Sequence, residues 1–221
     1  MQKSYKYLTS ISVFFVSVLL ISNIASTKII DLKWFLFDGG TLLFPLSYIF
    51  GDILTEVYGY KKAKSVIWLG FFMALLMSLV FIIVGKLPGA PDWNNQNAYD
   101  LILGLTPRIV LASLFAYMIG SFSNSFILAK IKILTKGKML WLRTISSTIV
   151  GELLDSVIFI MIAFWGILPY SLLLTLIISN YLFKTAIEIL FTPATYKIVS
   201  FLKKKESEDY YDTNTNFNPF K

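Results

Sequence analysis

Residues 65–85 hold an unbroken apolar run, including the stretch LGFFMALLMSLVFIIV, without one charged side chain. A helix needs about 20 apolar residues to cross the hydrocarbon core of a bilayer, and this run has that length. Backbone polar groups find no water inside a bilayer, so such a segment must satisfy them within a helix. The run therefore predicts an integral membrane protein.

Five further apolar runs are bounded by polar or charged residues. The predicted spans cover residues 8–27, 40–59, 65–85, 108–129, 144–165 and 171–200, and a polar tail covers 202–221. We therefore predict a single polytopic, all-α membrane domain of six helices. The last run is longer than a span requires, so we expect it to tilt, to break near Pro193 or to continue along the interface.

Composition excludes several classes of chemistry. The chain has 56% hydrophobic residues and neither cysteine nor histidine, so disulfides, imidazole proton shuttles and ordinary zinc sites are excluded. Its polar stretches are too short to fold as a separate catalytic domain. We predict that the protein is not an enzyme and that it uses no catalytic residues, metal ligands or cofactor.

The net charge of +7 is distributed between apolar runs. Lysine and arginine collect in alternate loops, at residues 61–64, 130–143 and 203–205, and Lys6 precedes the first span. Because cytoplasmic loops carry the basic excess, we predict a multi-pass protein with both termini in the cytoplasm. We expect no nucleic-acid partner, and we expect the basic tail to touch anionic lipid and then extend into the cytoplasm. The alternative, a cleaved signal peptide over residues 1–27, lacks a good small-residue cleavage site.

Acidic side chains occur inside the predicted spans. They are Asp52, Glu56, Glu152, Asp155 and Glu188. An acid at the centre of a membrane helix costs about 2.5 to 3.5 kcal/mol, and such residues usually face a cavity or a partner. Glu188 lies four residues after Lys184, a spacing that favours an intrahelical ion pair. The other four acids could instead lie near helix ends in contact with water.

Two polar patterns repeat at an offset of about 100 residues. SNIASTK (22–28) resembles SNSFILAK (123–130), and GDILTE (51–56) resembles GELLD (151–155). Three spans separate the partners, so the two halves would have opposite orientations. Inverted repeats of this kind occur in secondary transporters, whose substrate sites lie near the midplane. The pattern favours a 3+3 inverted repeat.

The polar side chains within the spans define what a site could recognise. An ionised carboxylate accepts two parallel N–H donors, while the carboxamides of Asn23, Asn124 and Asn180 recognise mixed donor and acceptor edges. A flat heteroaromatic with a 2-aminopyrimidinone edge fits these groups, and aromatic side chains could stack on its faces. A small cation or a proton fits the composition equally well.

The segments NIASTKII and GGTLLFPLSYIFGDILTEVYGYKKA carry a recognisable signature. They resemble the queuosine-precursor transporters, a family also described as vitamin uptake transporters. The similarity continues through LRTISSTIVGELLDSVIFIMIAFWG (142–166), the spacing of Lys184, Pro193 and Tyr196, and the tail YDTNTNFNPF. The resemblance implies a six-helix inner-membrane importer of 7-cyano-7-deazaguanine, 7-aminomethyl-7-deazaguanine or queuine, which supply a tRNA modification.

The resemblance also implies functional positions. They are Asn23, Lys28, Pro45, Tyr48, Asp52, Glu56, Tyr58, Gly59, Arg143, Ser146, Ser147, Asp155 and Lys184. Combined with the buried acids and amides, the predicted substrate-binding set is Asn23, Lys28, Tyr48, Asp52, Glu56, Asn124, Glu152, Asp155, Asn180, Lys184 and Glu188. Asp52 or Asp155 is expected to bind the guanine-like edge, with Asn23 and Lys184 on the acceptor side.

Three other functions are compatible with parts of the pattern. The chain has no GxxxxGK[ST] phosphate loop, so a vitamin-binding membrane component would need a separate ATPase module. An intramembrane aspartyl protease could pair Asp52 with Asp155, but the sequences around them lack the expected context. A scaffold protein has no need for so many buried acids. The small size of a six-helix unit is compatible with a homodimer.

Overall fold

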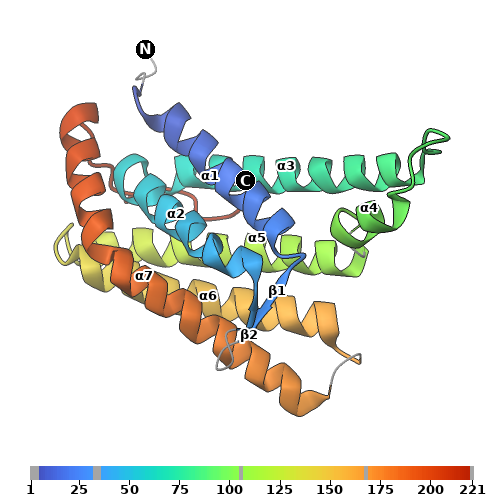
Figure 1. Ribbon diagram of the computed structural model, residues 1–221. Helices are drawn as coiled ribbons and strands as arrows, with labels where there is room; N and C mark the ends of the chain where they lie inside the picture. Colours follow the sequence, from blue (N-terminus) through green and yellow to red (C-terminus); the bar gives the residue numbers. More distant parts are fainter. Residues whose placement is uncertain (1–4, 32–35, 105–106, 167–168, 220–221) are drawn as a thin grey trace.

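The computed structural model describes residues 5–31, 36–104, 107–166 and 169–219. Within these ranges the chain forms seven α-helices and one short two-stranded ribbon (Figure 1). The helices are α1 (Leu8–Ala25), α2 (Phe44–Tyr58), α3 (Tyr60–Lys86), α4 (Gln96–Ile102), α5 (Pro107–Leu134), α6 (Leu140–Phe164) and α7 (Tyr170–Glu206). The prediction of an all-α integral membrane protein is confirmed.

Five of the described helices are long and apolar enough to cross a bilayer. These are α1, α3, α5, α6 and α7. Helix α2 has only 15 residues, which gives a length of about 22 Å, shorter than the roughly 30 Å of a hydrocarbon core. The six-span count and the inverted repeat therefore stay predictions.

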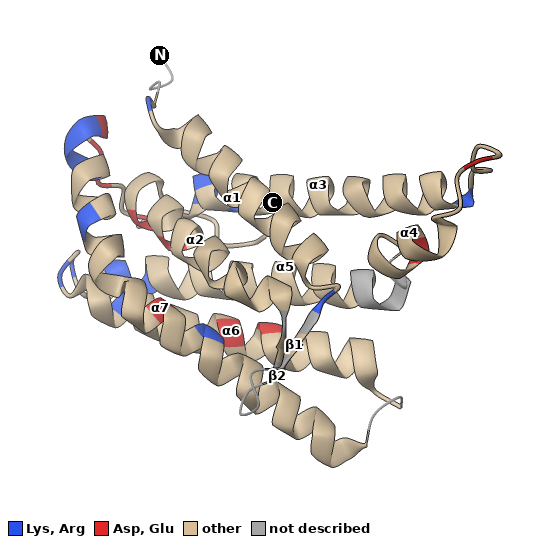
Figure 2. Ribbon diagram, in the orientation of Figure 1, with Lys and Arg blue, Asp and Glu red and all other residues tan. Residues whose placement is uncertain are grey.

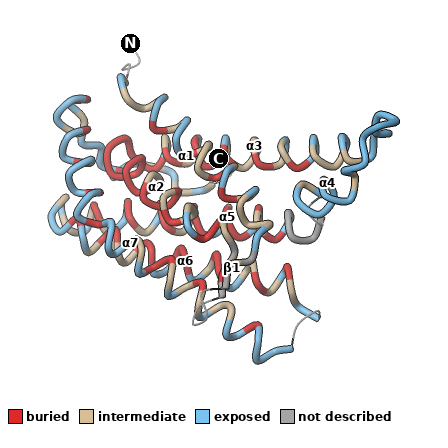
Figure 3. Tube along the Cα trace, in the orientation of Figure 1, coloured by how far each residue is buried: buried red, intermediate tan, exposed pale blue. Residues whose placement is uncertain are grey.

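Helix α2 lies at the centre of the bundle. Figure 3 shows buried backbone along most of its length, and the side chains of Ile53, Leu54 and Val57 are fully buried. Pro45 lies in the first turn, where its missing N–H costs no helical hydrogen bond. At the other end Gly59, with φ of 85°, links α2 directly to α3. The centre of the fold is therefore a short helix surrounded by long ones.

The chain passes from α1 to α2 through an antiparallel ribbon. Strand β1 (Ile29–Asp31) pairs with β2 (Leu36–Asp38), with Ile30 opposite Phe37. A 3₁₀ helix, Gly39–Leu42, follows. Phe37 is buried and stacks on Phe183 of α7 with ring centroids 5.2 Å apart. The ribbon thereby fixes the start of α2 against α7.

Helix α7 continues through Pro193 without ending, so the predicted break there does not occur. The tail also differs from expectation, because it folds back along the bundle instead of extending away (Figure 1). The backbone N–H of Tyr60 donates to Asp212 at 2.9 Å, and the Trp68 indole N–H donates to the Pro219 carbonyl at 2.8 Å. The sequence pattern of bases followed by acids gave no sign of these contacts with α3.

Basic residues gather at one end of the bundle, which we call the lysine-rich end (Figure 2). It contains Lys61, Lys62, Lys64, Lys130, Lys132, Lys136, Lys138, Arg143, Lys203, Lys204 and Lys205. The start of α3, the loop between α5 and α6, and the end of α7 meet there. The basic loops that alternate along the sequence therefore lie together at one end of the structure.

Candidate functional site

A cavity of about 670 Å³ lies in the half of the bundle remote from the lysine-rich end. Its walls come from the end of α1, the start of α2, and the adjoining halves of α3, α5, α6 and α7. Small-molecule sites usually measure about 300 to 1,000 Å³, so a compound of nucleobase size fits. Exposed residues of α4 and the turn after it, including Asp100, Leu101 and Gly104, form part of its rim.

Lys184 provides the cation of the cavity. Its Nζ donates to Asp155 Oδ2 at 2.6 Å and lies 3.5 Å from Glu152 Oε2, both on α6. The same Nζ lies 4.3 Å from the centroid of the Phe44 ring. The predicted intrahelical pair with Glu188 is wrong, because the Glu188 carboxyl instead hydrogen-bonds the Thr148 hydroxyl of α6. The lysine therefore links α7 to α6.

Two of the predicted amides reach the same cavity. Asn180 is buried, and its Oδ1 has no hydrogen-bond partner among the described residues. Asn23 Oδ1 accepts a hydrogen bond of 3.0 Å from Ser113 of α5. The rings of Phe37, Phe44, Phe159 and Phe164 complete the lining. The cavity thus combines a carboxylate, an ammonium group and amides with aromatic walls.

Several predicted residues lie outside this lining, deeper in the bundle. The Asn124 amide donates to Asp52 Oδ1 at 2.6 Å, joining α5 to α2. The Tyr48 hydroxyl donates to the Gly151 carbonyl at 3.3 Å. Glu152 and Glu188 are also buried there. These groups form a polar layer between the cavity and the lysine-rich end.

Glycines allow the helices of this layer to approach closely. A Cβ on Gly120 of α5 would lie 3.0 Å from the Gly151 carbonyl and would overlap the Tyr48 hydroxyl. A Cβ on Gly151 would lie 2.9 Å from both the Asn124 Cβ and the Tyr48 ring. Both glycines are therefore required by the packing of α2, α5 and α6.

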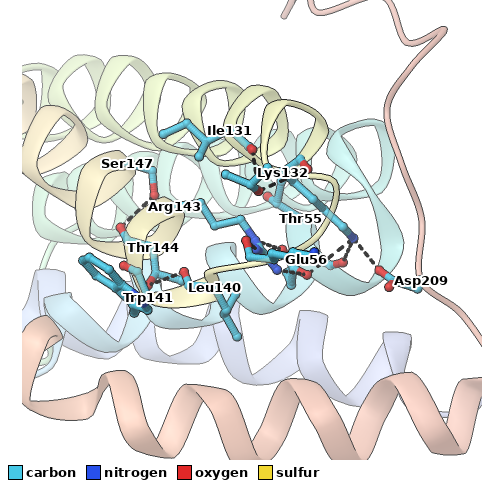
Figure 4. Close-up of polar contacts among 12 residues, drawn as sticks. Thr55, Glu56, Ile131, Lys132, Leu140, Trp141, Arg143, Thr144, Ser147 and Asp209 are labelled. Atoms are coloured by element: carbon cyan, nitrogen blue, oxygen red, sulfur yellow. Dashed lines mark hydrogen bonds and ion pairs between the residues drawn. The ribbon is translucent and has the colours of Figure 1, made fainter.

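Glu56 lies in a separate charged cluster at the lysine-rich end (Figure 4). Arg143 donates from Nε and Nη2 to its two carboxylate oxygens, each at 2.6 Å, and Lys203 binds the same carboxylate. Lys132 donates to the Glu56 carbonyl and, at 2.6 Å, to Asp209 of the tail. Burial alone would raise the pKa of Asp209, but hydrogen bonds from Lys132 and Lys203 lower it below its ordinary value. The cluster joins α2, α5, α6, α7 and the tail.

The predicted set therefore divides between several places. Asn23, Asp155, Asn180 and Lys184 line the cavity. Tyr48, Asp52, Asn124, Glu152 and Glu188 form the polar layer, Glu56 belongs to the charged cluster, and the Lys28 side chain is exposed beside the ribbon.

Comparison with known proteins places the chain among transporters. Residues 38–198 match the family described as "Putative vitamin uptake transporter". The chain belongs to this family. A Bacillus subtilis (strain 168) relative named "Probable queuosine precursor transporter" is 32% identical over 79% of this chain and 77% of the relative. The Escherichia coli (strain K12) "Queuosine precursor transporter" is 25% identical over 95% of this chain and 94% of its own length. No solved structure is significantly similar to this chain.

The family resemblance noted in the sequence is thus confirmed. The sequence pattern did not, however, single out some residues that surround the polar groups of this vitamin uptake transporter family member. The partner of Glu188, Thr148, lies four residues before Glu152 and so faces the same side of α6, a spacing that could have identified it. The aromatic walls of the cavity had no such signal, because phenylalanine is abundant on lipid-facing surfaces as well.

Proposed function

We propose that this chain imports queuosine precursors across a bacterial inner membrane, with the lysine-rich end and both termini in the cytoplasm. The substrates are 7-cyano-7-deazaguanine, 7-aminomethyl-7-deazaguanine and queuine, which supply tRNA modification. The names of the relatives and the family match support this function. The observation that carries it is the Asp155–Lys184 pair inside an aromatic cavity.

The chemistry of a deazaguanine suits these side chains. Its N1–H and 2-amino groups form two parallel donors, which the Asp155 carboxylate can accept. Its O6 is an acceptor for Lys184, and the Asn180 oxygen, which lacks a described partner, can take a further N–H. Of the two acids considered for the guanine-like edge, Asp155 lines the cavity whereas Asp52 is bonded to Asn124 outside its lining. We therefore assign the edge to Asp155.

The position of the cavity suggests a direction of transport. The cavity lies in the half away from the lysine-rich end, while the Glu56 cluster holds α2, α5, α6 and α7 together at that end. Alternating access requires the closed side to open after the substrate binds. Release into the cytoplasm then requires the ion pairs of Glu56 to separate.

The test is the queuosine content of tRNA in cells that lack both precursor synthesis and their own transporter. Cells expressing this chain alone receive one of the three compounds at nanomolar concentration. We expect restored modification, its loss in Asp155→Asn, and its retention in Asp92→Asn, which changes an exposed acid outside the cavity. Unchanged uptake by Asp155→Asn at normal membrane abundance would refute the assignment of the edge, and no uptake of any compound by the unmodified chain would refute the function.

A further inference from the structure

The polar layer contains carboxyl oxygens that the described residues leave without hydrogen bonds. Glu188 is 4% exposed; one carboxyl oxygen accepts from Thr148, and Oε2 has no hydrogen-bond partner among the described residues. Both oxygens of the fully buried Glu152 also lack a hydrogen bond within the described ranges. Lys184 approaches Glu152 only at 3.5 Å. A buried carboxylate without partners is costly, so these atoms require an explanation.

The local charges do not balance. The carboxyls of Asp52, Glu152 and Glu188 are buried together. Among the described residues, Lys184 is the only cation in an ion pair with any of these three, and it also binds Asp155. Arg143, which acts electrostatically on Asp52, is held by Glu56. Removing one partner from a buried ion pair is strongly destabilising, because the remaining charge is left uncompensated. The layer must therefore bind positive charge.

A proton fits the site better than a metal ion. Among the described residues, no group of three or more acids is arranged to hold a metal. Glu188 interacts electrostatically with Tyr48 and Asp52 of α2 and with Glu152 of α6, and the charges of the two acids repel its own. The uncharged Asn124 of α5 contacts Asp52. A single proton makes the Glu188 carboxyl neutral and so removes both repulsions. Its Oε2 is then the carbonyl or the hydroxyl oxygen of a neutral acid.

We propose that Glu188, faced by Asp52 and Glu152, binds a proton that is carried inward with each substrate molecule. This coupling rests on the proposed import function. Lys184 connects the two events, because it contacts Asp155 in the cavity and Glu152 in the layer. A substrate whose O6 accepts a hydrogen bond from Lys184 draws the ammonium group away from Glu152. The uncompensated charge of Glu152 then favours the proton on Glu188. When the lysine-rich end opens, the O–H bond of Glu188 breaks and its proton passes to cytoplasmic water.

The first experiment measures accumulation in proteoliposomes with the outside more acidic by about one pH unit. One proton per substrate then supports about tenfold accumulation of 7-cyano-7-deazaguanine, because one pH unit is a factor of ten in proton activity and its free energy sustains a tenfold concentration ratio. We expect a ratio of accumulation with and without the gradient near ten, falling to about one in Glu188→Gln and unchanged in Asp92→Asn. Because the readout is the ratio of accumulation with and without the gradient, a variant that transports more slowly can still be compared with the wild type. A wild-type ratio of one, or a Glu188→Gln ratio equal to wild type, would overturn the coupling.

A second measurement needs no substrate, so it separates failure of the coupling from failure of the proposed function. Infrared spectra of the purified protein at neutral pH should contain the C=O band of a protonated carboxylic acid. The difference spectrum between wild type and Glu188→Gln should contain this band, which should shift in Thr148→Val and be unchanged in Asp92→Asn. Absence of the band in the wild type, or equal intensity in wild type and Glu188→Gln, would overturn the proton site whether or not deazaguanines are transported.

Discussion

Arg143 binds both carboxylate oxygens of Glu56 through two hydrogen bonds of 2.6 Å, and neither side chain is more than 1% exposed. The pair joins α6 to α2. Lys203 and Lys132 lie against the same glutamate, and Asp209 faces both lysines. One carboxylate thus holds together helices that must separate if this end is to open.

Arg143→Met should destabilise the protein by about 3 kcal/mol, because breaking a buried pair leaves an uncompensated charge and the two lysines replace the arginine only in part. Arg143→Lys should cost less, since it keeps the charge and loses the bidentate geometry. The melting temperature in detergent measures both. Lys61→Ala, at an exposed lysine of α3, is the control and should melt with the wild type. Equal melting temperatures for Arg143→Met and Lys61→Ala would contradict a stabilising role of the Arg143–Glu56 pair.

Two buried serines offer a matched test of the cavity. The hydroxyls of Ser125 and Ser156 are both buried without hydrogen-bond partners in the described structure, but only Ser156 lines the cavity. The chain has no cysteine, so single cysteines can be introduced without background. In right-side-out vesicles, Ser156→Cys should react with a small membrane-impermeant thiol reagent, and 7-cyano-7-deazaguanine should protect it. Ser125→Cys should stay unreactive. No labelling of Ser156→Cys would show that the cavity does not open to that side, and equal labelling of both variants would show that access does not depend on the cavity.

The glycine contacts predict unequal effects of adding one methyl group. Gly120→Ala and Gly151→Ala should each destabilise the bundle by about 1 to 3 kcal/mol, because the new Cβ meets backbone or rigid side chains. Gly51→Ala should be tolerated, since its Cβ would lie 3.9 Å from the Phe15 ring, an ordinary contact. Thermal unfolding in detergent compares the three. Gly51 and Gly151 occupy equivalent places in the repeated sequence pattern, so a large effect at both would argue that the two halves pack alike.

The tail predicts a dependence of stability on pH. Because the folded protein lowers the pKa of Asp209, this residue stabilises the fold above its ordinary pKa of about 3.9, and that contribution is lost as the pH falls through the lowered value. Asp209→Asn should therefore lower the melting temperature at neutral pH, and the difference from wild type should shrink in acid. The side chain is 44% exposed, so added salt should also reduce the difference. A difference independent of pH would show that charge plays no part.

Hydropathy predicted the long helices because apolar runs of span length have few alternatives in a bilayer. The run at 65–85 became part of α3, and the run at 171–200 became part of a longer α7. Helix α2 was harder to define, since a central helix is enclosed by protein and need not match the thickness of lipid. Its polar residues are satisfied by other helices, as the Asp52–Asn124 contact shows.

The buried acids were found from sequence because charge within an apolar run is conspicuous, but their partners were not. Local spacing suggested Lys184 with Glu188, whereas tertiary packing placed Lys184 against Asp155, 29 residues away. Glu56 appeared to be near an interface because tyrosines and a glycine follow it. Only the fold brings Arg143 onto it and shows that it lies apart from the cavity.

The charged cluster also sets an order for assembly. Along the chain, Lys132 follows Glu56 by 76 residues, Arg143 by 87 and Lys203 by 147. During synthesis α2 therefore emerges before any of these three cations has been made, in a helix too short to cross the bilayer alone. Stable integration of α2 must wait for α5 and α6, and the final ion pairs form only when the last helix has been translated. A chain truncated before α7 lacks Lys203 and Asp209, so its Glu56 cluster remains incomplete even after Arg143 has bound.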